Sequence, residues 1–393
     1  MTISTPKRLG ALILVGAFAF AACSNSGSSA APSTAASQAA SSAPSAAASD
    51  GSSAAPSMAA APLPPTAAVT LQGAGATFPT PLYESWFETY TGLYSNVQFD
   101  YQSIGSGGGI KAITEQTVDF GATDAAMKDE EIAALPAGTK ILHFPTALGA
   151  VVMIYNLDGV PNLNLDSAAI AGIYLGTITK WNDPAIVALN SGTTLPDEAI
   201  LVVHRSDGSG TTNAFTTYLD TVDPTWHSSV GKGKEVKWPT GTGAKGNDGV
   251  ATAVKQTPGA IGYVELNYAT ATGLTSASIK NADGNFVAGS TAGVTAAAEA
   301  AEADFPADFR QAPIINGAGK DTYPIASYTY MLEYQDQTNA DKGQALVAYT
   351  YWALTDGQSA EETLGYAPLP ASVAEKAIAQ LHLITTGGAP IWP

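Results

Sequence analysis

A strand that runs directly into a glycine-rich turn and then into a helix is the feature that most constrains this fold. The apolar residues 200–203 predict the strand, the segment RSDGSGT (residues 205–211) predicts the turn, and residues 212–219 have the spacing of a helix. The first amides of a helix have no partner within it and lie at the positive end of its dipole, so such a turn can bind an anion. Glycine and serine are also common in ordinary turns, so a plain connection is the alternative.

Two other turns repeat this design. The segments GATF (residues 75–78) and GSGGG (residues 105–109) each follow a predicted strand and carry a hydroxyl residue, Thr77 or Ser106, close to a predicted helix. Ligands of open α/β sheets bind beyond the carboxyl ends of the strands. The three turns together therefore predict one shared site for a small oxyanion, to which Ser209 and Thr211 add further hydroxyl donors.

Strands and helices alternate along the whole chain after the first 67 residues, which predicts an α/β fold with mainly parallel sheets. The predicted strands are residues 68–71, 97–101, 118–122, 140–144, 150–155, 200–203, 260–264 and 327–334. The predicted helices are residues 81–90, 110–116, 127–135, 167–174, 184–189, 212–219, 247–256, 291–303, 340–354 and 371–383.

Charged side chains beside these turns indicate which kind of anion the site would bind. The planar guanidinium of Arg205 fits a phosphate or carboxylate, and Asp207 is placed to orient it. Asp124 follows a predicted strand and would repel an anion, unless the anion carries a proton. Monohydrogen phosphate can donate a hydrogen to a carboxylate, whereas sulfate at neutral pH cannot. The alternative is that Asp124 caps the following helix.

Composition and motif spacing exclude several classes of protein. The formal charge of −17 argues against a nucleic-acid partner. The four histidines are scattered and Cys23 is the single cysteine, so we expect no metal site. The segment GTGAKG (residues 241–246) fits the dinucleotide fingerprint by letter but follows no predicted strand, so we expect no organic cofactor.

Three other functions stay open on the residues alone. One is binding of a different oxyanion, such as sulfate or molybdate. Another is a phosphatase that uses Ser106 or Ser209, although neither serine has the glycine spacing of a nucleophile elbow and no general base is identifiable. The third is a structural or adhesive surface protein, which would have no need of Arg205.

The N-terminus predicts export. Lys7 and Arg8 precede an apolar run over residues 9–22, which is typical of a signal peptide (residues 1–22). Cys23 follows at once and resembles the lipidated cysteine of bacterial lipoproteins, although Phe20 stands where that pattern favours leucine. Residues 24–65 are almost entirely Ser, Ala, Gly and Pro, so we expect residues 23–65 to form a disordered tether, anchored through palmitate or a similar lipid on Cys23 to the cell surface or the periplasmic membrane.

In combination, six segments resemble the PstS family, the periplasmic phosphate-binding proteins of high-affinity phosphate ABC transporters. In the family's order they are residues 73–79, 101–109, 118–124, 205–211, 246–249 and 259–265. The resemblance covers about residues 68–393, with Ser103 and Thr123 standing where the family often has Gly and Ser, and with a poor match over residues 288–304.

The resemblance implies a two-lobed, periplasmic-binding-protein-like fold of type II, with the ligand in the interlobe cleft. The first lobe would comprise residues 66–145 and 324–393, and the second lobe residues 146–323. It also implies a non-enzymatic monomer that binds inorganic phosphate without a cofactor and delivers it to a membrane permease.

The resemblance implies a role for each matching site residue. Thr77 and Phe78 would give backbone and hydroxyl donors, Ser106 a hydroxyl donor, and Asp124 would accept the phosphate proton. The remaining implied members are Arg205, oriented by Asp207, and the second wall of the site, formed by Ser209, Gly210 and Thr211.

Overall fold

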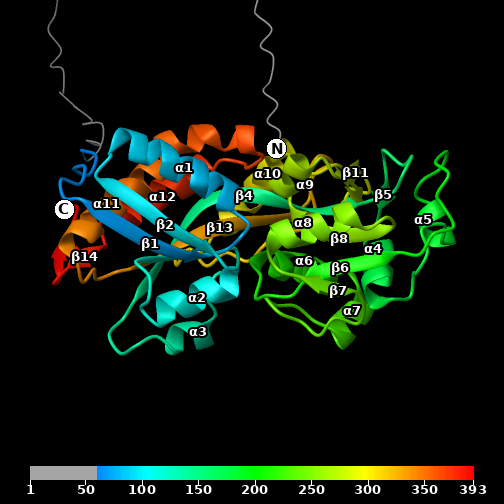
Figure 1. Cartoon of the computed structure of the whole chain (residues 1–393), viewed down its shortest axis with the longest axis horizontal. Coiled ribbons are helices and arrows are strands. Elements are labelled where there is room, and N and C mark those ends of the chain that lie inside the picture. The colour runs from blue at the N-terminus through cyan, green and yellow to red at the C-terminus, as the bar shows by residue number, and fades with distance from the viewer. Residues whose placement is uncertain (1–59) are drawn as a thin grey trace, which may run out of the picture. The chain divides into compact units, whose positions relative to one another are not determined.

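The computed structural model describes residues 60–393 (Figure 1). The predicted signal peptide, Cys23 and most of the predicted tether lie outside the described residues. At the start of the described chain, the Trp392 indole donates to the Ala60 carbonyl at 3.0 Å, and the Asn96 side-chain amide donates to the Pro65 carbonyl at 2.8 Å. The last residues of the predicted tether thus lie against the folded part of the chain.

One long strand, β4, connects the two halves of the main sheet. β4 (Ile141–Tyr155) pairs antiparallel with β13 (Ile325–Tyr334) through its first part, up to Ala150, and antiparallel with β8 (Ala260–Glu265) from Val151 onward. The order along the sheet is β2-β1-β3-β13-β4-β8-β6-β7. A single strand therefore passes from one half of the fold to the other.

The sequence predicted two strands where β4 is one, because Pro145 lies between them. Proline cannot donate to a sheet ladder and is tolerated mainly at edges and bulges. Pro145 faces Tyr330, at the place where the register of β13 shifts between Thr329 and Tyr330. The irregularity accommodates the missing amide, so the strand continues through the proline.

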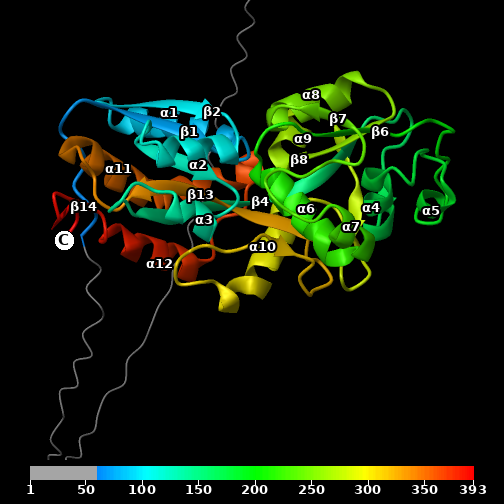
Figure 2. The ribbon, with the colours of Figure 1, turned by 90° about the horizontal axis from the view of Figure 1, so that it is seen from below.

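We call the part of the fold built on the first three strands the first lobe. β1 (Val69–Gly75) pairs parallel with both β2 (Val97–Ser103) and β3 (Phe120–Thr123). Figures 1 and 2 show α1 and α11 on one face of these strands and α2 on the other, in agreement with their packing. The helices of this lobe are α1 (Thr80–Leu93), α2 (Ser106–Thr114), α3 (Asp129–Ala133), α11 (Ala340–Ala353) and α12 (Ala371–Leu381).

The second lobe is built on β6, β7 and β8. β6 (Leu201–Arg205) pairs parallel with both β7 (Thr242–Ala244) and β8, and α8 packs on β6 and β8. The main helices of this lobe are α4 (Ser167–Leu175), α6 (Gly210–Val222), α8 (Gly246–Gln256) and α9 (Leu266–Thr272). Each lobe therefore has the predicted parallel core, to which β4 and β13 add antiparallel pairs.

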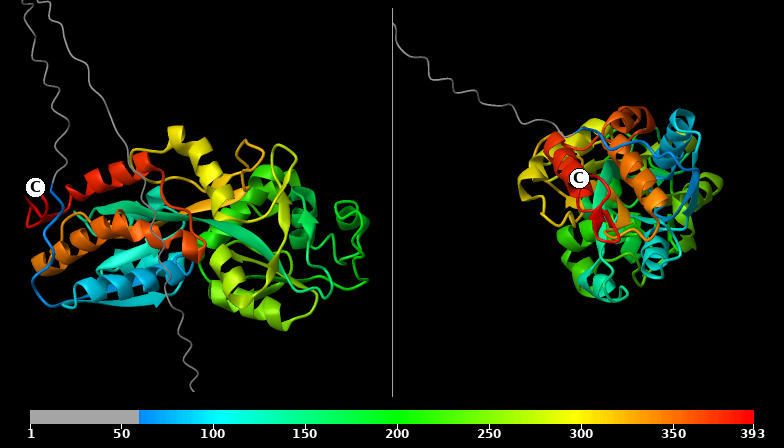
Figure 3. Two further views of the ribbon diagram at one scale, coloured as in Figure 1. Left: turned by 90° about the horizontal axis from the view of Figure 1, so that it is seen from above. Right: turned by 90° about the vertical axis from the view of Figure 1, so that its left-hand side faces the viewer.

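Shorter elements complete the fold. α11 and α12 pack against each other along the first lobe (Figure 3). Within residues 60–393, no helix is long and apolar enough to cross a membrane. The remaining α-helices and strands are α5 (Pro184–Val187), α7 (Pro224–Ser229), α10 (Thr291–Ala301), β5 (Asn164–Leu165), β9 (Thr275–Ser276), β10 (Ser278–Lys280), β11 (Phe286–Val287), β12 (Ile314–Ile315), β14 (Thr385–Thr386) and β15 (Ala389–Pro390).

The helices that follow the glycine-rich turns begin earlier than predicted. α2 starts at Ser106 instead of residue 110, and α6 starts at Gly210 instead of residue 212. Glycine has a low helix propensity, which hides these first turns from a pattern analysis. The consequence is that Ser106, Gly210 and Thr211 lie in the first turns of their helices, where backbone amides are free of helical partners.

Candidate functional site

The turns that the sequence predicted to converge meet where the two lobes face each other. The Gly107 amide of the first lobe donates to the Gly208 carbonyl of the second at 2.8 Å. Of the predicted binding residues, those with side chains are at most 3 % exposed: Thr77, Phe78, Ser106, Asp124, Arg205, Ser209 and Thr211. Gly210 is buried as well, so every predicted binding residue lies in the interior of the fold.

Ser106 joins the two lobes through its side-chain hydroxyl. Its Oγ accepts hydrogen bonds from the Gly210 amide at 3.0 Å and from the Asp124 amide at 3.1 Å, and it donates to Asp124 Oδ2 at 3.2 Å. A Cβ on Gly210 would lie 2.5 Å from the Asp124 Cβ. Only glycine allows this approach, so the second lobe presents bare backbone to Ser106 and Asp124.

Asp124 is a carboxyl group surrounded by hydrogen-bond donors. Its Oδ1 accepts from the Thr329 hydroxyl at 2.9 Å. Burial raises the pKa of Asp124 from 3.8 to about 7, against the lowering effects of the Thr329 hydrogen bond and the Arg205 charge. The following helix α3 begins at Asp129 after Lys128, so Asp124 does not cap it and the alternative interpretation of this residue is wrong.

Arg205 is held by a bidentate ion pair. Its Nε donates to Asp207 Oδ1 at 2.8 Å and its Nη2 donates to Asp207 Oδ2 at 2.5 Å, while Nη1 points to Thr211 Oγ1 at 3.4 Å. Burial raises the pKa of Asp207, but the hydrogen bonds and charge of Arg205 outweigh it and hold that pKa below its ordinary value. The geometry leaves the Arg205 fork fixed in orientation beside the hydroxyl of Thr211.

Ser209 plays a local structural part as well. Its Oγ accepts from the Thr212 amide at 3.0 Å and so caps α6.

In the first lobe, the amides of Thr77 and Phe78 make no hydrogen bond within residues 60–393. The predicted binding residues therefore offer two amides without a hydrogen-bond partner, several hydroxyls and a guanidinium as donors, and the Asp124 carboxyl as an acceptor.

Sequence comparison identifies the relatives of this fold. The chain matches the profile of the PBP superfamily domain over residues 31–356. It is 42 % identical over 332 residues to the phosphate-binding protein PstS of Pasteurella multocida, an alignment that covers 83 % of this chain and 94 % of that protein. The chain belongs to the PstS family. A PstS protein of Methanocaldococcus jannaschii is 36 % identical over 340 residues, covering 81 % of this chain and 87 % of the relative.

Solved structures support the same fold for this PstS-family chain. A phosphate-binding protein from Stenotrophomonas maltophilia has a TM-score of 0.64 at 23 % identity, with 82 % of this chain and 96 % of that chain covered. A high-affinity periplasmic phosphate-binding protein named PfluDING, solved with bound phosphate, has a TM-score of 0.65 at 22 % identity, covering 80 % of this chain and 94 % of the other. The predicted fold class, α/β with two periplasmic-binding-protein-like lobes, is confirmed.

Asn247 is a bridging residue that the site prediction for this PstS-family chain missed. Its Nδ2 donates to Thr77 Oγ1 of the first lobe at 2.9 Å and to Thr211 Oγ1 of the second at 3.2 Å, and its Oδ1 accepts from the Glu265 amide at 3.1 Å. Asn247 is the second residue of α8, which begins at Gly246 shortly after β7 and so forms a fourth strand–glycine–helix turn. The signal was present in residues 246–249, but the three residues of β7 are too few to predict a strand.

Tyrosines from distant parts of the chain fix the Thr77–Phe78 turn. The Tyr268 hydroxyl donates to the Thr77 carbonyl, and the Tyr366 hydroxyl donates to the Phe78 carbonyl at 2.7 Å. Tyr366 Oη also lies 3.1 Å from Oε2 of the fully buried Glu265. The Thr77 carbonyl and the Phe78 amide belong to one trans peptide unit and point in opposite directions, so the contact with Tyr268 also fixes the orientation of the Phe78 amide.

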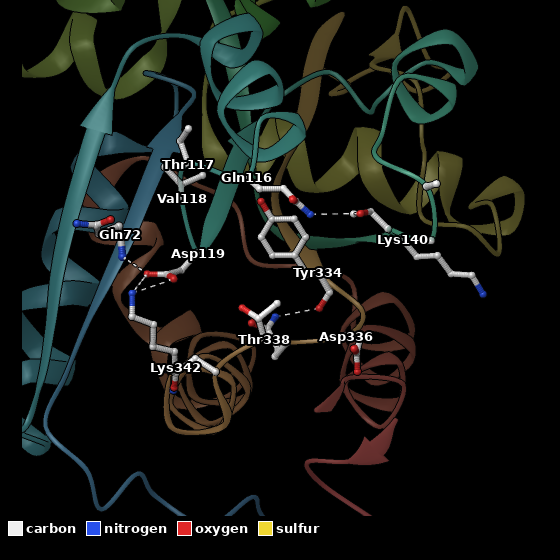
Figure 4. A pocket seen from close by; sticks show the side chains of 15 residues that line it. Gln72, Gln116, Thr117, Val118, Asp119, Lys140, Tyr334, Asp336, Thr338 and Lys342 are labelled. Atoms are coloured by element: carbon white, nitrogen blue, oxygen red, sulfur yellow. Dashed lines mark hydrogen bonds and ion pairs between the residues drawn. The ribbon is translucent and has the colours of Figure 1, made fainter. Parts of the chain in front are cut away.

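A separate cavity lies elsewhere on the first lobe and is not part of this site. It has a volume of about 600 Å³ and is lined by none of the predicted site residues. Figure 4 shows that its polar groups pair with one another: Lys342 Nζ lies 2.7 Å from Asp119 Oδ2, which also accepts from the Gln72 amide at 2.7 Å. Within residues 60–393, no group of three or more His, Cys, Asp or Glu side chains is placed to hold a metal ion.

Proposed function

We propose that this chain binds inorganic phosphate between its two lobes, outside the cytoplasm, and delivers it to an ABC-type import permease. The names of its relatives support this function, since proteins up to 42 % identical are called phosphate-binding proteins. The observation that carries the proposal is Asp124, a buried carboxyl with a pKa of about 7 that lies among hydrogen-bond donors. An oxyanion without a proton has only acceptor atoms, so it would gain nothing from an acceptor such as Asp124 in its site.

The proposed binding mode uses donors that are already in place. The free amides of Thr77 and Phe78 would donate from the first lobe, together with the Ser106 hydroxyl, which would turn from Asp124 to the phosphate. Arg205 would add charge-assisted hydrogen bonds, and Asp207 keeps its fork oriented. Groups held in this way lose little conformational freedom when the ligand binds, so the entropic cost of binding is small.

The second lobe would close the site from the other side. Its donors are the hydroxyls of Ser209 and Thr211 and the amide of Gly210, which lies against Ser106 at 3.0 Å. We add Asn247 as a positioning residue, because it bonds the hydroxyls of Thr77 and Thr211 at once. A ligand that contacts both lobes in this way favours their closed arrangement.

Asp124 would supply the selectivity. One hydrogen must lie between its carboxyl group and the bound oxyanion, carried either by phosphate or by Asp124 itself. When Asp124 is ionised, only an anion that brings this hydrogen can bind without repulsion. Sulfate at neutral pH brings none, so phosphate is favoured.

The same proposal includes the organisation of the chain. Residues 66–145 and 324–393 would form the first lobe and residues 146–323 the second, behind a signal peptide (residues 1–22) and a tether (residues 23–65) that is lipidated at Cys23. The protein would act as a monomer at the cell surface or in the periplasm. We propose no catalysis, since Ser209 Oγ caps α6 and Ser106 Oγ is engaged by Gly210 and Asp124, which supports binding over hydrolysis.

Calorimetry on the full chain tests the function. We expect phosphate to bind with one site per chain and to raise the midpoint of thermal unfolding, because a ligand that binds only the folded state stabilises it. Sulfate at the same concentration and at pH 8 should do neither. A chain that bound neither anion, or that bound both equally well, would contradict the proposal.

A further inference from the structure

An ion pair joins the two lobes next to the site. Glu131 lies on α3 of the first lobe, and Lys234 lies between α7 and β7 of the second. Lys234 Nζ is 2.5 Å from Glu131 Oε1, and the two side chains are 11 % and 27 % exposed. Both charges are therefore largely removed from solvent, which separates this contact from an ordinary surface pair.

Lys234 is also hydrogen-bonded to the proposed site, and Glu131 is hydrogen-bonded to the segment that follows Asp124. The Lys234 carbonyl accepts from the amide of Ser209 at 3.0 Å, so the lysine backbone holds the turn that begins α6. Glu131 Oε2 accepts from the amide of Lys128 at 2.9 Å and thereby fixes the start of α3, the helix that follows Asp124 along the chain. One carboxylate thus caps α3 and binds the other lobe at the same time.

We propose that Lys234 and Glu131 are positioning residues that hold the Asp124 segment against the Ser209 turn and set how slowly phosphate leaves. The inference rests on the proposed function, since it concerns release of that ligand. Opening of the lobes must separate the two charges and expose them singly, so the pair adds to the barrier for release. When one partner of a desolvated, hydrogen-bonded charge pair is removed, the main effect is a higher dissociation rate.

The chain offers a matched control pair. Lys180 Nζ and Asp197 Oδ1 are 2.6 Å apart, with side chains 58 % and 66 % exposed, and both belong to the second lobe. This pair has the same charges and nearly the same distance, but it neither joins the lobes nor is desolvated. Lys180→Met and Asp197→Asn therefore remove an ion pair without affecting the proposed contact.

The test measures phosphate association and dissociation by stopped flow on the full chain. Lys234→Met and Glu131→Gln should each raise the dissociation rate by about tenfold and leave the association rate within about twofold. Lys234→Arg, which keeps the charge, should restore slow release. The double variant should release phosphate no faster than either single variant, because one loss already breaks the contact. Control variants should match the wild type.

A second readout needs no phosphate. The Gly107 amide donates across the lobes to the Gly208 carbonyl, so its hydrogen exchange reports opening directly. In ligand-free protein, Lys234→Met should speed exchange of the peptide that contains Gly107, whereas Lys180→Met should not. If wild-type protein failed to bind phosphate, the proposed function would fall while this readout still tested the contact. Unchanged exchange and unchanged dissociation, or equal effects from the control pair, would overturn the inference.

Discussion

The amide of Gly210 and the hydroxyl of Ser106 lie 3.0 Å apart although 104 positions separate them in the chain. The bond joins the first turn of α6 in the second lobe to the first turn of α2 in the first. Because Gly210 has no side chain, its backbone amide reaches the Ser106 hydroxyl directly. Asp124 lies within the same contact through its hydrogen bond with Ser106.

Gly210→Ala should prevent this approach. The added methyl group would lie 2.5 Å from the Asp124 Cβ and 2.7 Å from Ser106 Oγ. Since overpacking of this kind costs about 1–3 kcal/mol, phosphate affinity measured by calorimetry should fall by roughly tenfold to a hundredfold. The matched control is Gly92→Ala, since a methyl group there meets nothing within 4 Å. Equal affinities for the two variants would show that the lobes close in another way.

Asn247→Ala should weaken both the fold and the site. It removes the donors to Thr77 and Thr211 and leaves the buried Glu265 amide without its acceptor, at a cost in unfolding free energy of about 1–3 kcal/mol. Asn281→Ala is the control, because Asn281 is 5 % exposed and bonds the carbonyls of Gly319 and Thr322, outside the site. Denaturant unfolding should show a loss of stability in both variants. Calorimetry should show weaker phosphate binding for Asn247→Ala alone. Comparable affinity losses would mean that Asn247 acts only through stability.

Buried carboxyl groups predict an unusual dependence of stability on pH. Glu333 is fully buried, and burial raises its pKa from 4.5 to about 8. Between those values the folded chain keeps a proton that the unfolded chain has lost, so the free energy of unfolding should fall as pH rises from about 5 to 8. The slope is at most roughly 1.4 kcal/mol per pH unit for this group.

Glu333→Gln should flatten that slope in urea unfolding measured at several pH values. The raised pKa values of Asp124, Glu265 and Glu361 act in the same direction, so part of the slope will remain. Glu88→Gln, at an exposed position of α1, is the control. A wild-type protein whose stability rose steadily from pH 5 to pH 8 would show that these carboxyl groups are ionised in the fold.

How much of this arrangement the sequence predicts depends on the range of the contacts. Ser209, Gly210 and Thr211 were predictable because one local pattern, a strand followed by a glycine-rich turn and a helix, identifies them. Asn247 follows the same pattern but was missed, since β7 is too short to be recognised. Continuity of β4 through Pro145 was missed because its partner, the irregularity in β13, lies far away in the sequence.

Contacts between distant segments had no signal in the pattern. The Tyr366 hydroxyl reaches the Phe78 carbonyl across 288 positions, and Thr329 reaches Asp124 across 205. Nothing in the spacing around Tyr366 or Thr329 distinguishes them from ordinary core residues. Only the antiparallel pairing of β13 with β3 and β4 brings Thr329 beside the end of β3. The supporting contacts of the candidate site thus depend on the topology, whereas a local sequence pattern marks most of the residues proposed to form it.

Sulfate binding should depend on pH through Asp124. The carboxyl group has a pKa of about 7, so it is ionised above that value and repels an anion that brings no hydrogen. Below it, protonated Asp124 can itself donate to the anion. Sulfate affinity of the wild-type chain, followed by calorimetry from pH 8.5 to pH 5.5, should therefore rise as pH falls through about 7. Affinity that stays constant over this range would contradict the role given to Asp124.

The most direct measurement of the central claim is the ratio of phosphate affinity to sulfate affinity at pH 8, compared between the wild-type chain and Asp124→Asn. Asparagine keeps the shape of the side chain but replaces an acceptor-only carboxylate with a neutral group that can donate. The account predicts that the wild type strongly prefers phosphate and that Asp124→Asn loses most of this preference, mainly by gaining sulfate affinity. An unchanged ratio would show that the hydrogen carried by phosphate is not what the site recognises.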